Sequence, residues 1–371
     1  MRRSFGVSAF LFVGALVGAG IFALPNAFAQ MGVWRASAWF WFFAILVGVT
    51  HLLYVDVIFA RKEKHRLPGH VREILGRRWG ILAMTTHFIQ LYGVQLVYLL
   101  LGGAFLQAFA ATLGYGLPVW TGVLMIFTLG AGAIRLGLKK VASVDALITL
   151  IMLGLLLLVA NAAWHHGPAP THFFPHLPWE AFGLIIFALN GLPFIDGIVD
   201  LCGKDRVFAR KIVLGRGFLA ALVTWTFAFA LAYAGGTQIG SQPHDLLLVL
   251  PEWGKLVLPL AGLMAVTMSY LSLGEELQAT WVRDYRIARP YAWLITFVPT
   301  ALLALFMNDG FLVLVAILGT ICGGANGVFV GMMRTALAEQ RRESLVLILG
   351  TMTVFVYAFG MSGQIISWLF L

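Results

Sequence analysis

The sequence predicts an all-α, polytopic membrane protein with about eleven transmembrane helices. Of its 371 residues, 60% are hydrophobic and only 11% are charged, whereas soluble domains carry about 25% charged residues. The apolar residues fall into long runs, and a membrane-spanning helix needs about 20 mostly apolar residues. The basic residues lie almost wholly in the short stretches between these runs. Most apolar side chains must therefore face lipid or other buried helices.

The apolar runs predict eleven spans joined by short loops. Their approximate bounds are 5–30, 35–60, 81–112, 117–134, 143–164, 179–202, 212–234, 255–277, 290–307, 311–332 and 344–369. Two loops have helical character: 61–80 is predicted to be a short amphipathic helix, and 241–254 a short helix on the outer surface. No sequence remains for a soluble domain, so residues 1–371 form one transmembrane domain.

The distribution of Lys and Arg predicts the orientation. The loop 61–78 carries seven of them, and the loops after spans four, six, eight and ten carry three or four each. The opposite side has only Arg35 and Lys255. Because basic loops stay in the cytoplasm, we expect a cytoplasmic N-terminus and an external C-terminus in a bacterial-type cytoplasmic (inner) membrane.

Composition argues against several other classes of site. The net charge of +9 follows the loops, so it indicates topology rather than nucleic acid binding. Cys202 and Cys322 lie in or beside apolar spans and suggest neither a disulfide framework nor a zinc site. The loop after span five is predicted to be solvated rather than metal-binding, although it holds four histidines: His165, His166, His172 and His176. We expect no metal and no cofactor, and the N-terminal run lacks a signal-peptide cleavage site.

Two spans contain helix-breaking residues near their middle. Span one reads VGALVGAGIFALP, with Gly18 and Gly20, and span six reads FALNGLPFIDG, with Asn190, Gly191 and Pro193. Irregular backbone at membrane depth is tolerated only where it is buried or lines a cavity. Paired interruptions in corresponding halves of the chain are a pointer to a transporter binding site.

The ends of the half-helices suggest the chemistry of that site. The outer half of span one is predicted to begin near Ala19, with unpaired amides that suit a carboxylate. Free carbonyls at the ends of the inner halves suit an ammonium group or a cation. A zwitterionic amino acid needs no charged side chain there. The alternative is that the glycines only pack helices closely, which we favour for Gly14 alone.

The binding hypothesis makes a specific prediction at Gly20. A leucine there should abolish binding while leaving folding largely intact, because the residue would line a cavity. The packing alternative predicts lower stability and expression instead.

GAGIFALP in span one and FALNGLP in span six resemble the amino acid–polyamine–organocation (APC) superfamily. The resemblance is closest to the aromatic and hydroxy amino acid permeases, which are related to the amino acid/auxin permeases. It implies a LeuT-like fold: a five-plus-five inverted repeat with broken helices 1 and 6, and one extra C-terminal helix. Repeat one would cover about 5–164, repeat two about 179–332 and the extra helix about 344–369. The resemblance also implies backbone groups of Leu16, Ala19 and Gly20, with Phe187, Ala188 and Asn190, around the substrate. The predicted substrate-binding residues at the two breaks further include Gly18, Ile21 and Gly191.

Span three adds two polar candidates. Gln95 and Tyr98 lie near mid-depth and share a helical stripe with Tyr92. In the related fold span three faces the site, so the Tyr98 hydroxyl could meet the substrate carboxylate. Hydrogen bonding between helices is an equal alternative.

Span eight, AVTMSYLSLGEEL, bears on the coupling ion. In sodium-coupled relatives, adjacent hydroxyl residues here join carbonyls of span one, which would be those of Gly14 and Val17. This sequence offers Thr267 and Ser269, which are not adjacent, so the expectation is a proton rather than sodium.

Acidic residues are the candidate proton carriers. Glu275 is one, although pairing with Arg283 and Arg286 at the interface is the simpler interpretation. Asp145, Asp196 and Asp200 lie in the inner halves of spans five and six, and the sequence does not rank them.

These observations predict a secondary active transporter, an ion-coupled symporter of aromatic or other neutral amino acids, working by alternating access. Its partners would be the amino acid and the lipid bilayer, with the oligomeric state open. A channel would need a continuous polar lining, and a membrane-embedded enzyme would need clustered acidic or His residues. The sequence shows neither, and it contains no GxxxxGK[ST] motif for ATP. We therefore expect no enzymatic activity.

Overall fold

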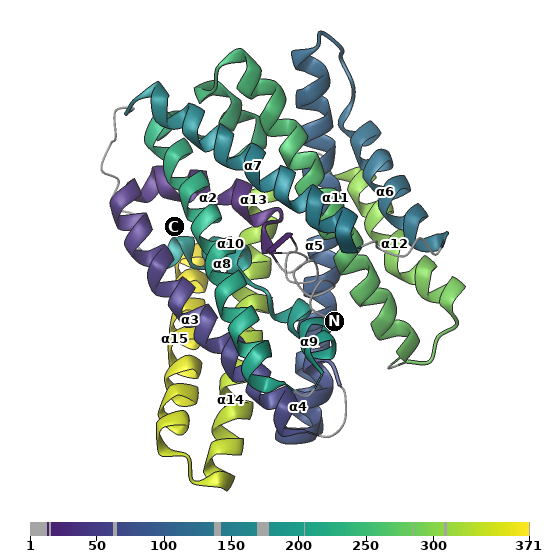
Figure 1. Ribbon diagram of the computed structural model, residues 1–371, viewed down its shortest axis with the longest axis vertical. Helices are drawn as coiled ribbons and strands as arrows, with labels where there is room; N and C mark the ends of the chain where they lie inside the picture. Colours follow the sequence, from purple (N-terminus) through teal and green to yellow (C-terminus); the bar gives the residue numbers. More distant parts are fainter. Residues whose placement is uncertain are drawn as a thin grey trace.

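The computed structural model describes residues 13–14, 16–61, 65–136, 142–168, 178–203, 205–283, 285–307 and 310–370. Every regular element in these ranges is helical. Figure 1 shows the helices packed side by side, with α14 and α15 as a pair at one edge and α6 and α12 at another. Within the bundle, α5 packs along α11, and α2 packs against α8 and α10.

Nine elements of the described chain are long and apolar enough to cross a membrane. They are α3 (Val33–Ala60), α5 (Arg77–Thr112), α7 (Ala142–His166), the pair α8 (Phe182–Leu189) and α9 (Leu192–Cys202), α10 (Arg206–Gly235), α11 (Glu252–Arg283), α12 (Arg289–Phe306), the series from α13 (Phe311–Ile317) to α14 (Gly324–Arg341), and α15 (Ser344–Phe370). The shorter apolar helix α6 (Val119–Arg135) matches the fourth predicted span, and α2 (Gly20–Met31) lies in the first, whose residues 5–12 are outside the described part of the chain. The predicted fold class is confirmed, whereas the residue bounds of the two repeats stay a prediction.

Two short elements occupy the loops with predicted helical character. Helix α4 (Leu67–Leu75) lies inside the range 61–80 and buries Val71 completely. The segment predicted at 241–254 is a 3-10 helix (Pro243–Val249), and α11 begins soon after it at Glu252. The Asn26 side chain of α2 donates hydrogen bonds to the carbonyls of Ile239 and Gly240, at 3.2 and 2.9 Å, just before this segment. The two remaining 3-10 turns are Pro178–Ala181 and Gly236–Gln238.

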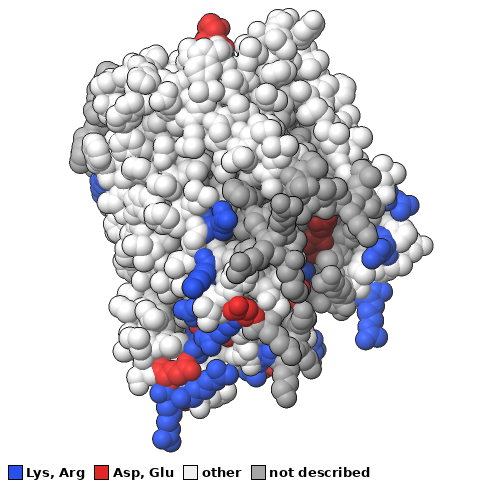
Figure 2. Space-filling model, in the orientation of Figure 1, with Lys and Arg blue, Asp and Glu red and all other residues white. Residues whose placement is uncertain are grey.

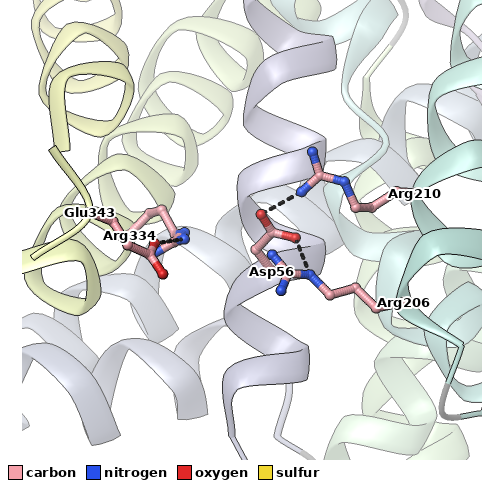
Figure 3. A network of polar contacts seen from close by, with 5 residues as sticks. All are labelled: Asp56, Arg206, Arg210, Arg334 and Glu343. Atoms are coloured by element: carbon pink, nitrogen blue, oxygen red, sulfur yellow. Dashed lines mark hydrogen bonds and ion pairs between the residues drawn. The ribbon is translucent and has the colours of Figure 1, made fainter. Parts of the chain in front are cut away.

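Lys and Arg gather at one end of the bundle, which we call the basic end (Figure 2). Charged groups there tie helices together. The Asp56 carboxylate of α3 accepts from Arg206 Nε at 2.9 Å and from Arg210 Nη1 at 2.6 Å, both on α10 (Figure 3). Arg334 of α14 pairs with Glu343 at 2.5 Å, beside the start of α15.

The tenth predicted span, 311–332, is not one continuous α-helix. Between α13 and α14 it passes through a π-helical segment, Leu318–Gly323. This segment packs against α8 so closely that a Cβ on Gly319 would lie 1.8 Å from the carbonyl oxygen of Gly183. Long-range packing of this kind leaves no local pattern in the sequence, since the residues 311–323 are mostly apolar.

Candidate functional site

Both predicted helix breaks are present. In span one, residues 13, 14 and 16 are helical, residues 17–19 are not, and α2 begins at Gly20. In span six, α8 ends at Leu189, Asn190 and Gly191 leave the helix, and α9 begins at Leu192. The local chemistry of glycine, asparagine and proline explains both positions.

The two broken spans touch at Gly20. A Cβ placed on Gly20 would lie 2.4 Å from the Cα of Ala188 and 2.8 Å from its Cβ. This is backbone contact, which cannot yield as the tip of a flexible side chain can. The prediction that a leucine here would leave folding largely intact is therefore wrong: Gly20 is a packing contact between α2 and α8 as well as a residue of the site.

A small cavity of about 30 Å³ lies between the two breaks and α5. The described residues around it carry no charged side chain; they are Leu16, Gly18, Ala19, Gly20, Gln90, Leu91, Val94, Tyr98, Phe187, Asn190, Pro193, Phe194 and Leu273. Such a volume holds about one or two water molecules. An amino acid can enter only if the walls move apart.

The two helices that start at the breaks differ in how their first amides are satisfied. In α9, the Gly191 N–H donates to His51 Nε2 at 3.1 Å, and the Leu192 N–H donates to the Asn190 side chain at 3.2 Å. In α2, no side chain caps the N-terminus, whose N-cap residue is Ala19. The Ile21 and Phe22 amides of α2 instead donate to the backbone carbonyls of Gly18 and Ala19, at 3.4 and 3.2 Å. No side chain of the described chain therefore offsets the partial positive charge of this helix start.

His51 fixes the second break from α3. Its Nε2 must be unprotonated in this state because it accepts the Gly191 N–H, and the side chain is only 3% exposed. We expect His51→Leu to lower the free energy of unfolding by about 1–3 kcal/mol, the cost of a buried amide without a partner. His51→Gln, which keeps an acceptor, should lose less. Thermal unfolding of the purified proteins measures the difference, and equal losses would contradict this role.

The polar candidates of span three, which lie on α5, have different surroundings. Tyr98 lines the cavity, and its hydroxyl hydrogen-bonds with Ser269. Gln95 does not reach the cavity: it is fully buried against α12, where its Oε1 accepts from the Thr300 hydroxyl at 3.5 Å. Tyr92 also turns to α12, donating to the Ile295 carbonyl at 2.9 Å. Only one side of the predicted stripe therefore faces the break.

Of the nine substrate-binding residues predicted at the two breaks, three do not line the cavity: Ile21, Ala188 and Gly191. Ile21 is buried elsewhere in the core, Ala188 contacts Gly20, and Gly191 bonds to His51.

The candidates for ion coupling fall into two groups. Ser269 lies at the first break, where its hydroxyl donates to the Gly14 carbonyl at 3.5 Å. Val17, three positions after Gly14, is fully buried. Thr267 turns away and donates to the Leu263 carbonyl of its own helix. The structure thus brings one hydroxyl of α11 to span one, and whether an ion binds there stays a prediction.

Glu275 does not lie near either break. It is exposed on the face of α11 that borders a cavity of about 280 Å³ with Arg135 and Arg289. The adjacent Glu276 points inward instead and pairs with Arg66 at 2.9 Å. Neighbouring positions on a helix are about 100° apart, which is why two consecutive glutamates have different surroundings.

Several residues near the site carried no recognised signal in the sequence. Leu91 and Val94 line the cavity on the same face of α5 as Tyr98, and Phe194 follows the second break. Thr149 of α7 faces Gly14, whose added Cβ would lie 2.5 Å from the threonine hydroxyl. The spacing of Leu91 and Val94 from Tyr98 could have placed them, since residues three, four and seven apart share a helix face.

Two predictions rest partly on residues outside the described ranges. His165 and His166 end α7 in exposed positions, whereas His172 and His176 are not described. The Asp145 side chain is likewise outside the described part.

Comparison with known proteins shows the family of this chain. The model of the family "Transmembrane amino acid transporter protein" matches residues 1–230, more than half of the chain. This chain belongs to that family. Among curated proteins, it is 23% identical over 362 residues to tyrosine-specific transport system 2 of Haemophilus influenzae (strain ATCC 51907 / DSM 11121 / KW20 / Rd), covering 86% of this chain and 84% of that protein.

Among solved structures, the fold is similar to that of MhsT, whose crystal structure was determined in complex with L-phenylalanine. The TM-score is 0.66 and the identity 14%, over 99% of this chain and 98% of the other. This likeness supports the LeuT-like, multi-pass membrane fold, and family and fold together identify a transporter of the amino acid class.

Proposed function

We propose that this protein is a secondary active transporter of aromatic amino acids, coupled to an ion and working by alternating access. The observation that carries the proposal is the uncharged cavity between two broken helices, with the uncapped start of α2 at its wall. A helix N-terminus binds a carboxylate through its amides, and the carbonyls that end the preceding half-helix suit the ammonium group.

The side chains around the cavity favour an aromatic substrate. Tyr98, Phe187 and Phe194 contribute rings to its wall, and aromatic rings attract each other beyond the burial of their area. Tyrosine is the named substrate of the Haemophilus influenzae relative, and L-phenylalanine is the ligand in the MhsT structure. Both are consistent with the proposed substrate class.

A binding and transport experiment tests this function. Purified protein is screened against the common amino acids at two pH values, with and without sodium, and the best ligands are then followed into proteoliposomes. We expect tyrosine, phenylalanine or tryptophan to bind, and saturable uptake against a concentration gradient. Preference for charged amino acids would contradict the substrate class. A flux that neither saturates nor accumulates its solute would instead indicate a channel.

The orientation is part of the proposal. The basic end would face the cytoplasm of a bacterial-type inner membrane, because loops rich in Lys and Arg are retained there. Reporter fusions are expected to place the N-terminus in the cytoplasm and the C-terminus outside. Finding both termini on one side would contradict an odd number of crossings.

A further inference from the structure

A buried polar cluster joins three helices and the start of a fourth at the basic end. Its members are Tyr54 of α3, Asp196 of α9, Glu276 of α11 and Arg66, the N-cap residue of α4. The side chains of Asp196, Glu276 and Arg66 are only 8%, 12% and 13% exposed. We call this group the Asp196 cluster.

Among the four members, Asp196 has a carboxylate whose negative charge is only weakly offset by hydrogen bonds and positive charges of the described residues. The Tyr54 hydroxyl lies 3.1 and 3.0 Å from Oδ1 and Oδ2, but one hydroxyl proton serves one oxygen at a time. Arg66 Nη1 is 4.0 Å from Oδ2, whereas Arg66 Nε bonds to Glu276 at 2.9 Å. A buried carboxylate with so little compensation from the described residues is costly to keep charged. The protonated acid can keep its contact with Tyr54, whereas it no longer attracts the Arg66 guanidinium.

The other described charged groups near Asp196 do not stabilise its ionised form. Asp200, one turn further along α9, adds negative charge. Arg206 and Arg210 of α10 are bonded to Asp56 (Figure 3).

Two histidines complete the surroundings. His87 of α5 is 3% exposed, and neither ring nitrogen has a hydrogen-bond partner in the described chain. His70 of α4 lies with its ring edge-on to Tyr54. Burial lowers the pKa of His70 to about 4, and the positive charges of His65 and Arg61 act in the same direction. His70 is therefore neutral near pH 7.

The cluster is close to the solvent of the basic end. A cavity of about 900 Å³ opens there and is lined by His87 and Thr280, among others. The Thr280 hydroxyl donates to the Glu276 carbonyl at 3.0 Å, so this wall lies one helical turn from the cluster. About one turn of α11 thus separates this cavity from Glu276 of the cluster.

Asp196 is also on the helix that starts at the second break, five positions after Gly191. It faces Arg66, which is bonded to α11. We propose that Asp196 binds the coupling proton of the transport cycle, and that protonation releases α9 from Arg66 and α11 at the basic end. This inference rests on the proposed function, since it assigns the ion site of that transporter.

The test compares wild type with Asp196→Asn in proteoliposomes. Two assays are run: exchange of labelled tyrosine for unlabelled tyrosine without an ion gradient, and tyrosine accumulation driven by an inward proton gradient. The asparagine mimics the protonated acid. We expect exchange to stay within about threefold of wild type, and the accumulation ratio to fall to about one. Glu252→Gln, at an exposed carboxylate beside Lys255, is the matched control and should retain both activities.

Wild-type accumulation by Asp196→Asn in a proton gradient would overturn the assignment of Asp196 and leave the proposed function standing. Failure of the wild type itself to accumulate tyrosine or any other amino acid would overturn the proposed function. Accumulation by the wild type that needs sodium, and not protons, would overturn the proton site alone.

A second variant keeps the test decisive if Asp196→Asn does not fold. Tyr54→Phe removes only the hydroxyl that stabilises the carboxylate, so proton-driven uptake should reach half its maximal rate at a higher pH than in wild type. An unchanged pH profile in folded Tyr54→Phe protein would contradict the proposal.

Discussion

Replacing Gly18 by leucine is expected to abolish amino acid binding in a protein that still folds. A Cβ at this position would lie 2.8 Å from the Tyr98 hydroxyl oxygen and 3.0 Å from Ser269 Oγ. Both atoms are tips of side chains that can move, so the cost in stability should stay within the usual range of overpacking, about 1–3 kcal/mol. The leucine branches, however, would occupy the cavity beside the uncapped start of α2. We expect tyrosine affinity to fall about 100-fold or more, roughly 2.8 kcal/mol.

Two further leucine variants make this result specific. Gly20→Leu should lose stability and binding together, because its Cβ would meet the backbone of Ala188 at 2.4 Å. Gly154→Leu, in an exposed position of α7 with open space around it, should lose neither. Ligand-induced thermal shift and purified yield, measured side by side, distinguish the three. A folded Gly18→Leu protein with unchanged affinity would exclude this region as the binding site.

The helix breaks could be predicted from the sequence because their causes are local. Glycine permits backbone angles that other residues avoid, and proline removes an amide donor. Gly18 and Gly20 in one span, and Asn190 to Pro193 in the other, therefore place irregular backbone within a residue or two of where it is observed. Apolar run length likewise determines the crossings, since lipid demands a nearly constant helix length.

The direction of individual polar side chains could not be predicted in the same way. Gln95 and Tyr98 are three residues apart, yet one faces α12 and the other the cavity. Glu275 and Glu276 are adjacent, yet only Glu276 enters the buried cluster. In a span that is apolar on all sides, the rotation of the helix depends on its neighbours, and the hydrophobic pattern alone does not define it.

Contacts between distant segments were also invisible in the sequence. The Gln364 side chain of α15 accepts from the Gly183 N–H at 2.6 Å and from the Thr320 hydroxyl at 2.9 Å. It thus joins the last helix to the start of α8 and to the π-helical segment. A glutamine in the final span gives no hint of this role, because its partners lie 181 and 44 positions away.

This junction carries the largest stability effect that we expect. Gly319→Ala adds one methyl group, whose carbon would lie 1.8 Å from the Gly183 carbonyl oxygen and 3.0 Å from the Phe187 Cβ. The nearest obstacle is backbone, so α8 and the π-helical segment must separate. That separation also strains the bonds that Gln364 makes to both. We expect the free energy of unfolding to fall by about 3 kcal/mol or more, at the upper end of overpacking effects.

The same substitution at an unobstructed site should have the opposite sign. Gly215 is an exposed position of α10 with nothing within 4 Å of an added Cβ, and alanine is favoured over glycine in a helix by up to about 1 kcal/mol. Gly215→Ala should therefore unfold at the same temperature as wild type or higher, while Gly319→Ala unfolds well below it. Because Phe187 lies at the clash and in the cavity wall, Gly319→Ala should also weaken tyrosine binding in whatever protein remains folded. Equal thermal stability of the two alanine variants would show that α8 and the π-helical segment are not in this close contact.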